Sequence, residues 1–164
     1  MVNILDAIQG VTYPEKSILV PTDFKSLGRI GDLELEIAAL KNGEDSTELT
    51  KEQASLILAV KETSWEFTLR GLPSSVVDSI MRAKRAKIKD AAAQNKEFVR
   101  ELIITSIVRV KNYADEEAEF DKESLGKFLD AIPEDVYRRF SDTTDQLSGD
   151  ALHYEYTVTD PNFS

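Results

Sequence analysis

The clearest hydrophobic pattern in the chain is an alternation of apolar and polar residues in the segment 64–70. Trp65, Phe67 and Leu69 are separated by single polar residues, and a period of two places the three apolar side chains on one face of an extended strand. Gly71-Leu72-Pro73 then closes the strand. We predict that its aromatic face belongs to the core, and a peptide-binding face is the alternative.

The N-terminal part, residues 1–62, mixes helical and extended patterns. Apolar residues at positions 4–8 have the spacing of a short amphipathic turn, which Gly10 and Pro14 interrupt. Ser17-Ile18-Leu19-Val20 then predicts a short strand or an extended docking segment.

Two helices are predicted after this segment. The first covers about 23–40, with Asp32 as its N-terminal cap and Asn42-Gly43 at its end. Thr50-Lys51-Glu52-Gln53 has the S/T-x-x-E/Q pattern of a capping box and predicts a second helix over 51–61.

Four further helices are predicted to build the core, over 75–90, 96–112, 122–131 and 133–147. Ser74 or Ser75 is the expected cap of the first, and Asp121 of the third. Pro133 followed by two acidic residues suits the start of the fourth. The second is the best candidate for the central core helix because of its wide apolar face, formed by Phe98, Val99, Leu102, Ile103, Ile107 and Val110.

The last residues, 150–164, alternate only weakly, which is typical of an edge strand or of a flexible tail. Taken together, the patterns predict a mainly α fold, a small helical domain with one short β element and a flexible C-terminal tail. The expected segments are 1–62 (mixed helix and extended), 63–149 (the helical core domain) and 150–164 (the tail).

Composition narrows the function. The 164 residues are 41% hydrophobic and 30% charged, which is enough apolar material for a core. The net charge of −10 opposes nucleic-acid binding by the whole surface and favours a basic partner. The start of the chain is not that of a signal peptide, and no apolar stretch approaches the roughly 20 residues of a membrane span. We expect a soluble protein, and the absence of cysteine fits a reducing cytoplasm.

No motif indicates catalysis, a cofactor or a metal site. The single histidine, His153, has no recognisable catalytic partners. An EF-hand loop starting at Asp115 would need Gly at its sixth position and Glu at its twelfth, where Phe120 and Gly126 stand. The acidic segment 115–121 is therefore expected to be solvated, and we expect no enzyme activity.

One basic run, Arg82–Lys89, contains five cations. A solvated helix face is the expected interpretation. Nucleic-acid binding is one alternative, although the rest of the chain is strongly negative. Docking of an acidic segment, such as 115–121 from the same chain or from a second copy, is another.

The order of motifs from Trp65 to Leu147 resembles a known family. Thr68-Leu69-Arg70-Gly71-Leu72-Pro73 leads into a helix, and a second, apolar helix follows. Asp121-Lys122-Glu123-Ser124-Leu125 opens a third helix, and a fourth begins at Ile132-Pro133-Glu134-Asp135-Val136. This arrangement is similar to the tail assembly chaperones of long-tailed bacteriophages. The long N-terminal part and the basic run depart from the family pattern.

The resemblance implies a non-enzymatic protein of the host cell cytoplasm that binds the helical tape-measure protein and keeps it soluble during tail tube assembly. The tail tube protein and a second copy of the chain are further expected partners. We expect Phe128, Tyr137 and Phe140 to lie nearest the client, with plain core packing as the alternative. The alternative functions are a structural or connector protein retained in the virion and a small nucleic-acid-associated regulator.

Overall fold

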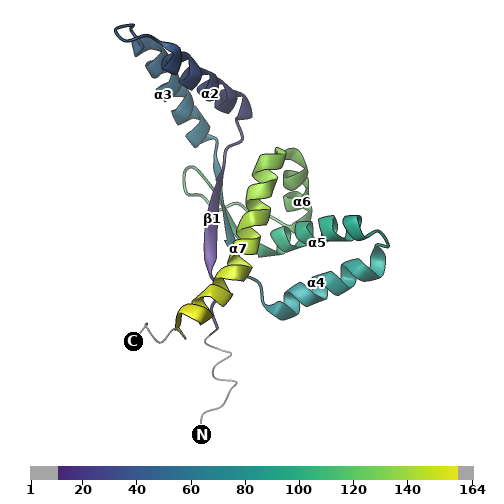
Figure 1. Cartoon of the computed structure of the whole chain (residues 1–164). Coiled ribbons are helices and arrows are strands. Elements are labelled where there is room, and N and C mark those ends of the chain that lie inside the picture. The colour runs from purple at the N-terminus through teal and green to yellow at the C-terminus, as the bar shows by residue number, and fades with distance from the viewer. Residues whose placement is uncertain (1–10, 159–164) are drawn as a thin grey trace. The chain divides into compact units, whose positions relative to one another are not determined.

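The computed structural model describes residues 11–158, and side chains from 11 to 147. This part of the chain is mainly helical and contains one small antiparallel sheet with the strand order β1-β2-β3, which confirms the predicted fold class. The elements, labelled in Figure 1 where space allows, are β1 (Glu15–Val20), α2 (Phe24–Ala39), α3 (Thr47–Glu62), β2 (Trp65–Arg70), α4 (Ser74–Lys87), α5 (Ala91–Ser106), β3 (Ile107–Asn112), α6 (Lys122–Ala131) and α7 (Glu134–Val158).

The chain forms two compact units, and each is assembled from segments that are distant in sequence. Unit 1 comprises the described parts of Met1–Ile18, Thr68–Val108 and Phe120–Ser164, and unit 2 comprises Leu19–Phe67 and Arg109–Glu119. Every strand contributes residues to both units. The division into 1–62, 63–149 and 150–164 stays a prediction.

Unit 1 has its core between α5, α6 and α7, and α4 packs against α5 (Figure 1). Ile103 on α5 and Phe140 on α7 have no exposed surface. Full burial of such a side chain stabilises the fold by about 1.5–3 kcal/mol. The other buried apolar residues of this unit are Ile18, Leu69, Ile104, Ile107, Leu125, Leu129, Val136 and Leu147.

Unit 2 is dominated by the hairpin of α2 and α3, which lie side by side (Figure 1). Arg29 on α2 binds Glu36 on the same helix at 2.7 Å and Glu52 on α3 at 2.8 Å. At the base of the hairpin, the Thr22 hydroxyl donates to the Thr63 carbonyl oxygen at 2.7 Å. These polar contacts matter because each helix buries little apolar surface.

The strand β2 has the bounds that the alternation predicts. Phe67 and Leu69 are buried and Trp65 is half-buried, which confirms the core interpretation of this face. Thr68 on the opposite face is also buried, and its hydroxyl lies 3.1 Å from that of Ser17 on β1. Ser17-Ile18-Leu19-Val20 is part of β1, so its strand interpretation is confirmed as well.

Helix α2 begins earlier than the cap at Asp32 predicts. Asp23 is the cap, because its carboxylate accepts hydrogen bonds from the Ser26 backbone N–H at 3.0 Å and from the Ser26 hydroxyl at 2.6 Å. Asp32 lies inside the helix, so that prediction is wrong. The helix ends at Ala39, and Gly43, with φ +94°, belongs to the loop that follows it.

Two other predicted caps are also wrong. Helix α3 begins at Thr47, so the capping-box sequence at Thr50 lies inside the helix. The Asp45 carboxylate accepts from the Thr47 N–H at 2.8 Å and so satisfies one of the free N–H groups of the first turn. Helix α4 begins at Ser74 directly after Pro73, which stands at the cap position and makes no side-chain cap hydrogen bond.

The predicted helix over 96–112 is wrong in its last third. Asp90 caps α5 by accepting from the Ala93 N–H at 2.7 Å, and the helix ends at Ser106. Residues 107–112 form β3 instead. This segment is rich in β-branched residues, and its apolar spacing fits either element. Pairing with β2 selects the strand over the helix. The described residues therefore form three strands, whereas the sequence predicted one short β element.

Helix α6 begins as predicted. The Asp121 carboxylate accepts from the Ser124 N–H at 2.7 Å, and the Ser124 hydroxyl accepts from the Asp121 N–H at 2.9 Å. Helix α7 continues to Val158, beyond its predicted end at 147, so the edge-strand alternative for the residues from 150 is wrong up to that residue. The flexible tail stays a prediction. Residues 159–164 and the predicted turn at 4–8 lie outside the described residues.

Candidate protein-binding surfaces

The α2–α3 hairpin exposes large apolar side chains that the sequence patterns did not single out. Leu35 is 72% exposed and Leu58 is 52% exposed. Leu27 and Ile57 are exposed as well, and only Leu33 and Val60 are buried on the two helices. Scattered exposed apolar residues are ordinary, whereas a contiguous exposed apolar patch is typical of a protein-binding surface. These four residues are therefore candidates for partner contact.

The local sequence explains this exposure. Leu56-Ile57-Leu58 are consecutive, so in a helix their side chains point in directions about 100° apart and cannot all face α2. Leu35 lies between two glutamates, whose side chains point about 100° to either side of it around α2. The two helices contain more apolar residues than a pair of packed helices can bury. Counting these residues in the sequence would have indicated the exposed side chains.

The predicted client residues lie in unit 1 in three different environments. Phe140 is fully buried, and Phe128 on α6 is half-buried with its ring against that of Phe140. Tyr137 is half-buried on α7, and burial raises the pKa of its hydroxyl, an effect partly opposed by nearby Arg100. Partner contact by Phe128 and Tyr137 stays a prediction, whereas a client would reach Phe140 only after the core opened.

Tyr137 lines a groove of about 720 Å³ between α5, α6 and the start of α7. Arg100 lies in its wall, where its guanidinium donates to both Asp130 oxygens at 2.7 and 3.0 Å and to the Gly126 carbonyl oxygen at 2.7 Å. The Asp130 hydrogen bonds raise the pKa of Arg100 further above its usual range. Most of the groove lining is charged, unlike the apolar lining of small-molecule pockets. The charged lining residues are Lys96, Glu97, Arg100, Asp130 and Glu134.

The basic run lies at the end of α4 and in the short link to α5. Arg82, Arg85, Lys87 and Lys89 are exposed, as the solvated interpretation predicts. Lys84 is half-buried and its ammonium lies 3.8 Å from Glu101 on α5.

The acidic segment that follows β3 forms a tight reversal. Ala118 N–H donates to the Val110 carbonyl oxygen at 2.9 Å, and Asp115 has φ 64°, a conformation that aspartate tolerates better than most residues. Lys111 binds the Asp115 carboxylate at 2.8 Å and lowers its pKa. Within residues 11–147, no three His, Asp or Glu side chains gather where they would hold a metal ion. His153 lies in the part of α7 whose side chains are not described.

None of the described helices is both long enough and apolar enough to cross a membrane. Comparisons with protein-family models, curated proteins and solved structures find no match to this chain.

Proposed function

We propose that this protein is a bacteriophage tail assembly chaperone, a non-enzymatic protein of the host cell cytoplasm that binds the tape-measure protein and keeps it soluble. The observation that carries the proposal is the apolar surface of the α2–α3 hairpin, with Leu35 as its most exposed member. A helical hairpin with uncovered leucine and isoleucine side chains suits the apolar face of a helical client.

The charge of the chain supports the same function. A protein that holds an apolar client in solution needs apolar contact surface together with strong like charge elsewhere. The net charge of −10 supplies that repulsion between complexes. The order of the motifs from Trp65 to Leu147, on which the family resemblance is based, gives further support.

The test is co-expression of the tagged chain with the tape-measure protein from the same genome, followed by affinity purification. We expect the client to shift from the insoluble to the soluble fraction and to co-purify with the chain. Unchanged client solubility would contradict the proposal. Mass spectrometry of purified virions gives a second criterion, because a chaperone leaves the particle. Stoichiometric amounts of the chain in virions would favour the structural or connector protein.

A further inference from the structure

The α4–α5 hairpin in unit 1 has an apolar helix face that the described structure covers only in part. No residue of α4 is buried, although Ile80 and Met81 are apolar, and Met81 lines a pocket together with residues of α5. Arg85 follows Met81 by four residues and Lys84 follows Ile80 by four. Residues four apart are neighbours on a helix surface, so the apolar and cationic side chains share one face of α4.

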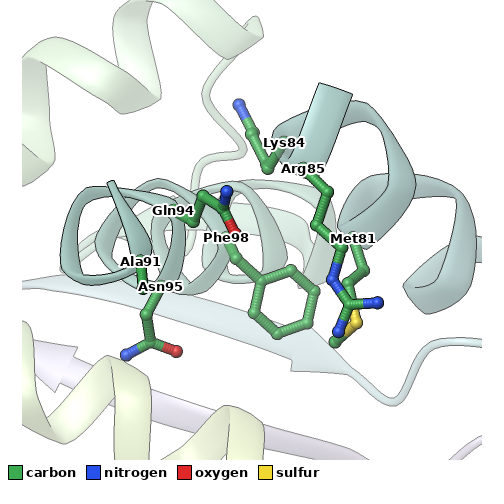
Figure 2. A pocket seen from close by; sticks show the side chains of 7 residues that line it. All are labelled: Met81, Lys84, Arg85, Ala91, Gln94, Asn95 and Phe98. Carbon is green, nitrogen blue, oxygen red and sulfur yellow. The ribbon is translucent and has the colours of Figure 1, made fainter. Parts of the chain in front are cut away.

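A pocket of about 120 Å³ opens on this face. Figure 2 shows the ring of Phe98 on α5 between the side chain of Asn95 and those of Met81 and Arg85 on α4. The remaining lining residues are Lys84, Ala91 and Gln94, so the lining combines apolar, amide and cationic groups without a carboxylate. Small-molecule pockets are typically about 300–1,000 Å³. This pocket therefore suits a single side chain that projects from a larger partner.

The cations around the pocket are available for a partner. Within residues 11–147, Arg82, Arg85, Lys87 and Lys89 form no ion pair, whereas Arg29 and Arg100 are each held by carboxylates. Four unpaired cations at one end of a helix stand out in a chain of net charge −10. Complementary potentials across an interface steer association and select the partner, so this end of the hairpin favours an acidic surface.

Polar contacts connect the two helices of the hairpin and the link between them. Asp90 caps α5, and the Gln94 side-chain amide donates to the Ile88 carbonyl oxygen in the link between the two helices. Glu101 binds Lys84 on α4 and Lys122 on α6, which ties α4 and α6 to the middle of α5.

We propose that the α4–α5 hairpin binds an acidic amphipathic helix of a partner protein. One apolar side chain of that helix enters the pocket between Met81 and Phe98, and its carboxylates face Arg85 and Lys87. Nucleic acid would engage the cations but would leave the apolar pocket unfilled, and the negative charge of the rest of the chain would repel it. The inference involves a surface of unit 1 and does not depend on the tape-measure client or on the α2–α3 hairpin.

The experiment uses the full chain and a fluorescently labelled synthetic peptide of about 18 residues, or five helical turns. The peptide has leucine at i, i+3, i+4 and i+7 spacing with flanking glutamates. Anisotropy titrations at low and at physiological salt give Kd. A peptide with the same composition in scrambled order controls for charge alone, and a peptide with lysine in place of glutamate controls for apolar contact alone.

Two variants test the site. The double variant R85E/K87E reverses two exposed cations, and K25E/K41E makes the same charge change at exposed positions on and just after α2. We expect R85E/K87E to weaken binding about tenfold, because two attractive charge pairs become repulsive, while the control changes Kd by less than about threefold. Ala91→Trp, at an exposed position of the pocket rim, should weaken binding by blocking the pocket without loss of a core side chain.

Several outcomes would overturn the inference. These are equal binding of the scrambled peptide, no binding of the designed peptide, or an R85E/K87E effect no larger than that of K25E/K41E. Tighter binding of a labelled single-stranded oligonucleotide, with loss of affinity at higher salt, would assign the surface to nucleic acid instead. Self-association that R85E/K87E abolishes in sedimentation experiments would assign it to a second copy of the chain.

Discussion

The rings of Phe128 on α6 and Phe140 on α7 meet edge to face, with their centroids 6.2 Å apart and their planes at 79°. This geometry is favourable for an aromatic pair, because the positive edge of one ring faces the negative face of the other. The two residues are not equivalent. Phe140 is completely buried and Phe128 is only half-buried, so core packing and partner contact can be tested separately with this pair.

We predict that Phe140→Ala lowers the free energy of unfolding by about 3–5 kcal/mol, as expected when a fully buried aromatic side chain leaves a cavity. Phe128→Ala should cost less, about 1–3 kcal/mol, because part of its ring is already in water. Urea denaturation monitored by circular dichroism measures both values. If Phe140→Ala keeps wild-type stability and loses the client, Phe140 is a contact residue and the core assignment fails.

A second prediction concerns the α2–α3 hairpin. The variant L35D/L58D should fold normally, because exposed substitutions usually change stability by less than about 0.5 kcal/mol each. It should nevertheless lose the solubilised client in the co-expression assay. The matched control is A38D/S55D, which adds the same charge at exposed positions of the same two helices and removes no large apolar side chain. Equal loss of the client in both variants would mean that charge, rather than the apolar surface, governs binding.

A third prediction concerns acid stability. Hydrogen bonds from the Ser124 backbone N–H and side chain lower the pKa of Asp121 in the folded protein, so folding favours its ionised form. Its contribution is fully present above the unfolded pKa of about 3.9 and is lost as pH falls through the lower folded value. We expect Asp121→Asn to reduce stability at neutral pH and to flatten the loss of stability below pH about 4.

Urea denaturation at a series of pH values measures this dependence. Asp142→Asn is the control, because Asp142 is an exposed residue of α7 whose side chain makes no hydrogen bond within residues 11–147. The control removes one exposed carboxylate of α7 and leaves the cap of α6 intact. An identical pH profile for Asp121→Asn and the unchanged chain would show that the cap of α6 does not contribute through its charge.

A fourth prediction concerns two neighbouring hydroxyls on α5. The Thr105 hydroxyl oxygen is buried without a hydrogen-bond partner within the described residues, whereas the Ser106 hydroxyl donates to the Leu102 carbonyl oxygen at 2.7 Å. Replacing an unsatisfied buried hydroxyl by a methyl group removes a desolvation penalty. We expect Thr105→Val to raise the unfolding free energy by about 1 kcal/mol and Ser106→Ala to lower it by a similar amount. Destabilisation by Thr105→Val would mean that the hydroxyl has a partner, such as a bound water molecule.

The elements that the sequence predicted well are those whose signals are local. The alternation at Trp65, Phe67 and Leu69 located β2, and Asp121, the expected cap, marked the start of α6. The apolar side chains of β2 share one face of the strand. The Asp121 side chain forms a hydrogen bond with a residue only three positions away. Such signals do not depend on the rest of the fold.

The sequence alone therefore determined the mainly helical class, the apolar strand, the acidic character and the lack of a catalytic motif. The tertiary structure decided that Ile107–Asn112 is a strand, because its apolar spacing also fits a helix and pairing with β2 selects the strand. It also decided which apolar side chains remain outside. Leu35 and Phe140 both appear as apolar helix residues in the sequence, but one is exposed and the other buried. Periodicity defines a helix face, whereas its burial depends on which neighbouring elements cover that face.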